Sequence, residues 1–140
     1  MNASLIKSEV NLNSSVSGQA SRRPLQGQSP YVMNASLYYV HAEKKIQANI
    51  SYNVFGNRIF GIGDSQFATI YEMNRNTVDF TFTKGLTNNL EFKIGVQDLL
   101  NAPFRYTEDG NRDFKITKSD QNISFYRRGT YFTAGISLKF

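Results

Sequence analysis

The chain has 140 residues, of which 40% are hydrophobic and 19% charged, with no cysteine and a net charge of +5. No stretch approaches the ~20 consecutive apolar residues of a membrane-spanning helix, and the absence of cysteine excludes disulfides and thiolate chemistry. The excess of Lys and Arg favours an anionic partner, but these residues are scattered along the sequence and form no basic stripe with interleaved aromatics, so we expect no nucleic-acid partner.

Alternation of apolar and polar residues with period two predicts six strands and no helix. The pattern is clearest from Thr77 to Lys84, where Val78, Phe80 and Phe82 are the apolar positions. Each predicted strand has one apolar face and one polar face. The other five expected strands run from Asn2 to about Val10, Met33–Tyr39, Ile46–Val54, Leu90–Gln97 and Thr130–Phe140.

Long and short connections alternate between these strands. The short ones are His41–Lys45 and Gly85–Asn89, and the long ones are Asn13–Ser29, Gly56–Asn74 and Asn101–Arg128. Tight turns at one end of a sheet and long loops at the other are typical of a transmembrane β-barrel. A soluble β-sandwich also shows alternation, but most of these runs reach the ~9–11 residues that a tilted membrane strand needs, against ~5–6 for globular strands.

The last strand resembles the C-terminal β-signal of outer-membrane proteins. That signal has a polar residue, a glycine two places later, alternating apolar positions and a terminal Phe, and Thr133, Gly135, Leu138 and Phe140 match it. The resemblance implies recognition by the barrel assembly machinery through strand addition at an unpaired edge. The alternative is an ordinary edge strand of a soluble sheet, although a long apolar edge exposed to water invites aggregation.

A second resemblance covers nearly the whole chain. Five segments are similar, in order and spacing, to TonB-dependent receptors of Bacteroidetes-type bacteria: Arg23–Tyr31, Asn34–Tyr39, Gly56–Ile59, Tyr71–Glu72 with Arg75–Asp79, and Val96–Asn101. This resemblance implies an outer-membrane barrel of about 22 strands that holds an N-terminal plug domain. The plug is absent from this chain, and six strands cannot close even a ~8-stranded barrel. We therefore expect residues 1–140 to be the C-terminal portion of such a barrel.

The expected function is uptake of a nutrient such as a siderophore or a glycan across the bacterial outer membrane. The implied partners are outer-membrane lipid and lipopolysaccharide, the assembly machinery, the remainder of the barrel and plug, and TonB through the plug. The ligand and its contacts stay open, because receptors of this kind share a wall and differ in loops and plug. The alternative functions are a soluble β-sandwich binding module and a barrel of another outer-membrane family, such as a passive porin.

Four residues have the spacing of some calcium-loop ligands: Asp109, Asn111, Asp113 and Asp120. Carboxylates at the first, fifth and twelfth positions and an amide at the third are what such a loop uses. However, Phe114 stands where the sharp turn of a calcium loop needs glycine. We therefore favour an ordinary polar loop and expect no metal site.

The remaining chemistry-bearing residues are a single histidine and two arginine pairs. His41 has no second histidine or cysteine with which to form a transition-metal or triad site, so we expect an interfacial role. The pairs Arg22–Arg23 and Arg127–Arg128 either bind phosphates of lipopolysaccharide or an anionic substrate, or form a solvated rim, which is the simpler hypothesis. No catalytic motif stands out, so we predict no enzyme activity and no cofactor.

Overall fold

The computed structural model describes residues 1–11 and 22–139. These residues form an all-β structure without helix, and its main element is a six-stranded antiparallel sheet, which confirms the predicted meander. The sheet order is β1-β4-β5-β8-β9-β12, so strands adjacent in this order are joined by one connection each. The strands are β1 (Asn2–Leu5), β4 (Tyr31–His41), β5 (Ile46–Phe55), β8 (Arg75–Gly85), β9 (Leu90–Gln97) and β12 (Tyr131–Leu138).

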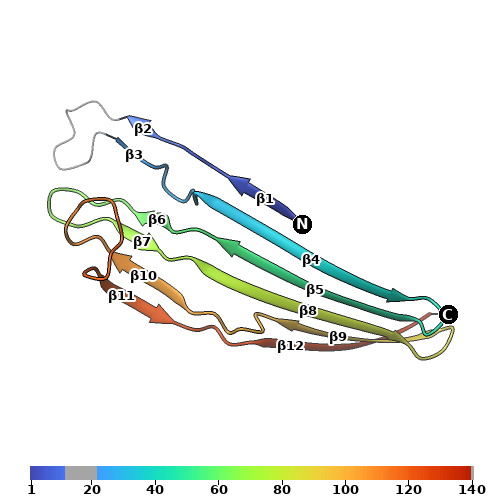
Figure 1. Ribbon diagram of the computed structural model, residues 1–140. Helices are drawn as coiled ribbons and strands as arrows, with labels where there is room; N and C mark the ends of the chain where they lie inside the picture. The colour runs from blue at the N-terminus through green and yellow to red at the C-terminus, as the bar shows by residue number, and fades with distance from the viewer. Residues whose placement is uncertain (12–21, 140) are drawn as a thin grey trace.

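The prediction that the long connections are loops was wrong, because they contain further strands. A four-stranded sheet in the order β11-β10-β7-β6 lies at the end where the long connections are, and a two-stranded sheet pairs β2 with β3 (Figure 1). These strands are short, so their alternation does not stand out in the sequence. They are β2 (Val10–Asn11), β3 (Arg22–Arg23), β6 (Arg58–Gly61), β7 (Ile70–Glu72), β10 (Phe104–Glu108) and β11 (Gln121–Tyr126).

The four-stranded sheet continues the hairpins of the six-stranded sheet beyond a break, which is the place where the pairing between strands is interrupted. Strand β6 follows β5, β7 precedes β8, β10 follows β9 and β11 precedes β12, so the neighbours are the same on both sides of the break. The first predicted strand is also shorter than expected. It ends at Leu5, and after the Ile6 N–H donates to the Pro30 carbonyl at 2.9 Å the chain leaves the six-stranded sheet.

The pairing register sorts the six-stranded sheet into an apolar face and a polar face, as the alternation predicted. One row of directly opposed residues on the apolar face is Leu37, Ile50, Phe80, Val96 and Phe132. Rows of the polar face include Ser36, Ser51 and Asp79, and next to them Asn49, Thr81, Gly95 and Thr133. Cross-strand contacts of this kind hold the sheet together within its own layer.

No second layer of described residues covers the apolar face. Leu37 is 70% exposed, Phe132 74% and Ile136 73%, although all three point to the apolar side. The buried hydrophobic residues of the described chain are only Val54, Ile59, Tyr71 and Ala102. Figure 1 shows the six strands side by side in one curved layer, with short turns at one end and long connections at the other. The sheet is not closed, because β1 and β12 are its two edges.

Among the residues that the structure describes, no helix is long and apolar enough to cross a membrane.

Candidate functional site

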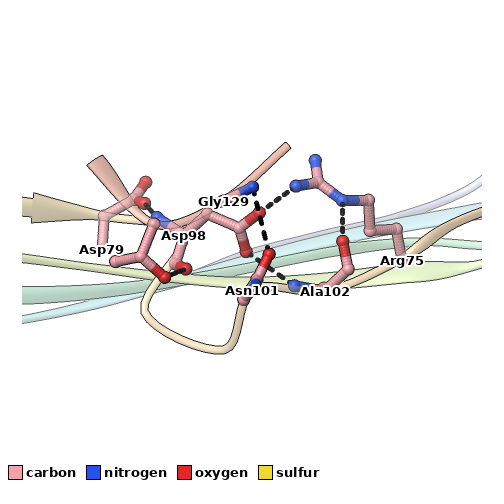
Figure 2. Close-up of polar contacts among 7 residues, drawn as sticks. Arg75, Asp79, Asp98, Asn101, Ala102 and Gly129 are labelled. Atoms are coloured by element: carbon pink, nitrogen blue, oxygen red, sulfur yellow. Dashed lines mark hydrogen bonds and ion pairs between the residues drawn. The ribbon is translucent and has the colours of Figure 1, made fainter. Parts of the chain in front are cut away.

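Two segments of the chain, Arg75–Asp79 and Val96–Asn101, meet at the break between the two sheets (Figure 2). Arg75, the first residue of β8, forms an ion pair with Asp98, which follows β9. Both side chains are largely buried, at 16% and 13% exposure. The Arg75 Nε also donates to the Ala102 carbonyl at 3.2 Å. Arg75 therefore ties the connection between β9 and β10 to the start of β8.

The Asp98 carboxylate and backbone organise the same connection. The Asp98 N–H donates to Asp79 Oδ1 at 2.8 Å, and its own Oδ1 accepts from the Ala102 N–H at 3.1 Å. The Thr130 hydroxyl donates to the Asp98 carbonyl at 2.9 Å, which attaches the start of β12. Asp98 has a φ of 52°, in the left-handed region that Asp and Asn tolerate better than most residues. Asp98, the residue directly after β9, thus anchors the connection to β8 and to the start of β12.

Asn101 and Gly129 join the two connections that cross this part of the break. Asn101 has a φ of 44°, and its Oδ1 accepts from the Gly129 N–H at 3.2 Å. Gly129 has a φ of 90°, a conformation that other residues rarely adopt. In the sequence, Asp98 and Asn101 stood out only as members of a segment with a family resemblance. In the structure, Asp98 contacts Arg75, Asp79 and Ala102, and Asn101 contacts Gly129.

Aromatic rings gather on one side of the four-stranded sheet, which we call the aromatic face. Phe60 of β6 meets Tyr106 of β10 edge to face at 4.7 Å between ring centroids, and Tyr106 lies 6.4 Å from Tyr126 of β11. Tyr126 stacks on Phe104 of β10 at 5.1 Å. The rings remain accessible, with Phe60 55% and Tyr126 39% exposed. Sequence analysis missed this cluster, although the Phe104 and Tyr106 alternation was a signal for it.

Three arginines surround the aromatic face. Arg58 pairs with the buried Glu72 at 2.8 Å, and Arg75 pairs with Asp98. The guanidinium groups of Arg75 and Arg128 lie 4.0 and 4.5 Å from the Phe104 ring. Arg128 is exposed and forms no ion pair within the described part of the chain. The aromatic face therefore offers rings together with one uncompensated cation.

The tyrosines of the four-stranded sheet lie in a drier environment than free tyrosine. Burial raises the pKa of Tyr106, and its hydrogen bond with Tyr126 and the nearby charge of Glu72 raise it further. Burial also raises the pKa of Tyr71 to about 12, with added effects from the charges of Asp109 and Asp113. Both phenols therefore stay protonated near neutral pH and keep a hydroxyl donor.

The residues with calcium-loop spacing close a loop with their own side chains. Asp109 is fully buried, and its carboxylate accepts from the N–H groups of Asp113 at 3.3 Å and Phe114 at 2.8 Å. Asn111 Oδ1 also accepts from the Asp113 N–H, at 3.3 Å, and Asp120 accepts from the Thr117 N–H at 2.6 Å. Within the described residues, no group of three or more His, Asp or Glu side chains is placed to hold a metal ion.

Of the residues matched to a β-signal, Thr133, Gly135 and Leu138 lie along β12, the last strand of the sheet. Thr133 is opposite Gly95, and a Cβ on Gly95 would lie 2.6 Å from the Thr133 hydroxyl oxygen, so these two positions fit each other. Gly135 is different, because a Cβ there would meet nothing within 4 Å. Leu138 is opposite Leu90 and 56% exposed. Phe140 lies outside the described residues.

The histidine and the arginine pairs lie at opposite ends of the six-stranded sheet. His41 ends β4 at the short-turn end, where its Nδ1 accepts from the Lys44 N–H at 3.4 Å. Arg22 pairs with Glu9 in the two-stranded sheet region, and Arg127 lies 5.8 Å from the Phe125 ring. The structure therefore brings Arg128 to the aromatic face but does not gather the two arginine pairs into one site.

Comparison of the chain with protein-family models, with curated proteins and with solved structures finds no match in any of the three.

Proposed function

We propose that this chain forms part of the wall of a bacterial outer-membrane β-barrel, namely the C-terminal part of a TonB-dependent receptor that takes up a nutrient. The observation that carries the proposal is the uncovered apolar face of a single-layered sheet with a polar opposite face. In water such a face would be an aggregation site, whereas a bilayer solvates it. Between neighbouring strands the sheet satisfies its backbone groups, as a membrane requires, and only the outer sides of β1 and β12 need further strands.

The apolar band has the dimensions of a membrane-spanning wall. On β8 it runs from Asn76 to Lys84, two polar residues that bound Val78, Phe80 and Phe82. At about 3.4 Å per residue this is about 27 Å along the strand, which at a tilt of about 40° gives about 21 Å across the bilayer. Outer-membrane barrels have an apolar band about 25 Å tall, so the length supports a spanning role.

The two edges of the sheet support a larger barrel. Strand β1 pairs only with β4, and β12 only with β9, among the described residues. Because six antiparallel strands lie in one sheet, β1 and β12 run in opposite directions, and further hairpins can continue the sheet at either edge. In our proposal the remaining strands of the receptor pair there, the plug domain fills the barrel, and TonB acts through the plug.

The β-signal resemblance gives the proposal an orientation. In outer-membrane proteins that strand ends in the periplasm, so the short turns would face the periplasm and the four-stranded sheet would stand outside the membrane. The aromatic face would then be the first surface to examine for contact with a siderophore, glycan or similar nutrient. Lipopolysaccharide would surround the wall at the same level, and the assembly machinery would act at β12.

A barrel of another outer-membrane family has the same wall, so the wall alone does not favour a receptor over a passive porin. The five receptor-like segments favour the receptor, and an encoded plug domain and TonB box upstream of this segment would decide between the two.

The soluble β-sandwich would need a second sheet about 10 Å above the apolar face, and the described residues supply none.

The proposal is tested by asking which solvent the folded chain needs. We expect the full chain to form monomeric β-structure in detergent micelles or phospholipid vesicles and to aggregate when the amphiphile is removed. Circular dichroism, light scattering and vesicle flotation measure this. A monomer that unfolds cooperatively in plain buffer and does not float with vesicles would contradict the proposal and favour the soluble alternative.

A further inference from the structure

On β4, β5 and β8 the apolar face ends near the short turns in a row of residues that contains a cation, and on β9 and β12 one further pair, Leu90 and Leu138, extends it. This row consists of His41, Ile46, Lys84, Phe92 and Ile136, which lie opposite one another on five neighbouring strands. Lys84 is the only Lys, Arg, Asp or Glu among the strand residues that the register assigns to the apolar face. A charge on this face needs a physical reason, because a membrane interior disfavours it.

The surroundings of Lys84 leave its charge uncompensated. The side chain is half-buried, and its Nζ donates to the backbone carbonyl of Lys44 at 2.6 Å, an acceptor without net charge. None of the ion pairs among the described residues involves Lys84. Glu91, which is close in the register, is opposite Gly85 and therefore on the polar face. Besides its bond to the Lys44 carbonyl, the ammonium group thus has N–H donors left with which to bind an anion at the level of the turn.

The other end of the apolar band lacks such a cation. On β8 the band ends there at Asn76, whose Oδ1 accepts from the Tyr52 hydroxyl at 2.7 Å. Both partners of that contact are uncharged side chains of the sheet itself. The apolar face is therefore asymmetric along its length, with a compensated amide at the long-connection end and an uncompensated ammonium at the short-turn end.

We propose that Lys84 binds the phosphate of an anionic glycerophospholipid in the leaflet that surrounds the short turns. This inference rests on the proposed membrane function and adds a specific lipid contact to it. The acyl chains of the lipid would lie on Phe92 and Ile136, which share the row, while the Lys84 stem follows the apolar surface and holds its ammonium at the headgroup level. Anionic headgroups attract each such basic residue, which supplies the selectivity.

The test uses the full chain in vesicles of phosphatidylcholine alone and of phosphatidylcholine mixed with phosphatidylglycerol. Native mass spectrometry of gently extracted protein measures which lipid stays bound. We expect about a five-fold enrichment of phosphatidylglycerol over its share of the mixture. Lys84→Gln removes the enrichment and Lys84→Arg keeps it. The matched control is Lys93→Gln, since Lys93 is opposite Thr83 on the polar face at nearly the same height, and it keeps the enrichment.

Two different failures have different meanings. Flotation and circular dichroism first establish that each variant inserts and folds. The proposed lipid site is wrong if wild type and Lys84→Gln both insert and retain phosphatidylglycerol equally. It is also wrong if Lys93→Gln loses as much of the enrichment as Lys84→Gln. Neither result contradicts the proposed membrane-spanning wall. If the wild-type chain enters neither type of vesicle, the proposed membrane function fails and the lipid site fails with it.

Discussion

The six-stranded sheet (the first sheet) and the four-stranded sheet (the second sheet) are stabilised in different ways, although the second continues the order of four strands of the first. On the short strands of the second sheet Ile59 is 1%, Thr107 3% and Tyr71 7% exposed, although the strands have only three to six residues. On the longer strands of the first sheet the apolar residues other than Val54 stay accessible, as Leu37 and Phe132 show. The second sheet therefore buries side chains as a water-soluble protein does. The first leaves its apolar face uncovered, and in our proposal a membrane covers that face.

The largest expected effect separates the two faces of the first sheet. Ile50 is 43% exposed, so in water Ile50→Lys would be nearly neutral. In a bilayer we expect it to lower the free energy of unfolding by about 3 kcal/mol, because a lysine near the midplane of a lipid-facing strand is costly. Urea titration of vesicle-inserted protein measures this. Ser51→Lys on the polar face is the matched control and should change stability little, and equal effects of the two variants would count against a lipid-facing side.

Removing the ion pair at the break tests how the two sheets are joined. Arg75→Met leaves the largely buried Asp98 carboxylate without its partner, and we expect the unfolding free energy of the second sheet to fall by about 2 kcal/mol. Amide exchange of Ala102 and Leu99 should accelerate, while amides in the middle of β5 keep their protection. Uniform acceleration across both sheets would show that the break does not separate them energetically.

High pH should loosen the second sheet before the first. The pKa of Tyr71 is raised to about 12 in the folded chain, against 10 for an ordinary tyrosine. Because folding raises this pKa, the protonated phenol stabilises the fold at pH values below the pKa of the unfolded tyrosine. This stability is lost as the pH rises toward 12, by about 1 kcal/mol at about pH 11. Stability measured against pH checks this, and Tyr71→Phe should remove that part of the loss. An unchanged pH profile in Tyr71→Phe would contradict the burial of this phenol.

The smallest expected effect concerns the exposed loop after β10. The N–H of Thr117 lowers the pKa of Asp120 below its usual value, as do the Thr117 hydroxyl and the Gly110 N–H. Because folding lowers this pKa, the charged carboxylate stabilises the loop at pH values above the pKa of the unfolded aspartate. This contribution disappears as the pH falls through the pKa of the folded state. We expect amide exchange at Thr117 to rise in Asp120→Asn relative to wild type at neutral pH, and the difference to vanish in acid. A difference that persists in acid would assign the effect to something other than the charge.

The five long strands of the six-stranded sheet were predictable from the sequence because each has enough alternating residues to specify a face, whereas the four-residue β1 was predicted too long. The four-stranded sheet was not predictable, because Arg58–Gly61 and Ile70–Glu72 are too short for a period to appear and depend on their neighbours across the break. The contact of Arg75 with Asp98 also joins residues far apart in the sequence, and no local pattern indicates it. The calcium-like spacing from Asp109 to Asp120 reflects a loop in which backbone N–H groups donate to these Asp and Asn side chains, a role that the same residue types serve equally well.

Lipid access along β8 tests the central claim most directly. The sequence contains no cysteine, so single cysteines from Thr77 to Thr83 can each carry a nitroxide label, and collision with oxygen or with a water-soluble nickel chelate reports apolar or aqueous surroundings. In vesicles we expect oxygen access at Val78, Phe80 and Phe82 and nickel access at Thr77, Asp79, Thr81 and Thr83. Nickel access at both sets, or a set of apolar positions closed to both reagents, would contradict a wall with lipid on one side and water on the other.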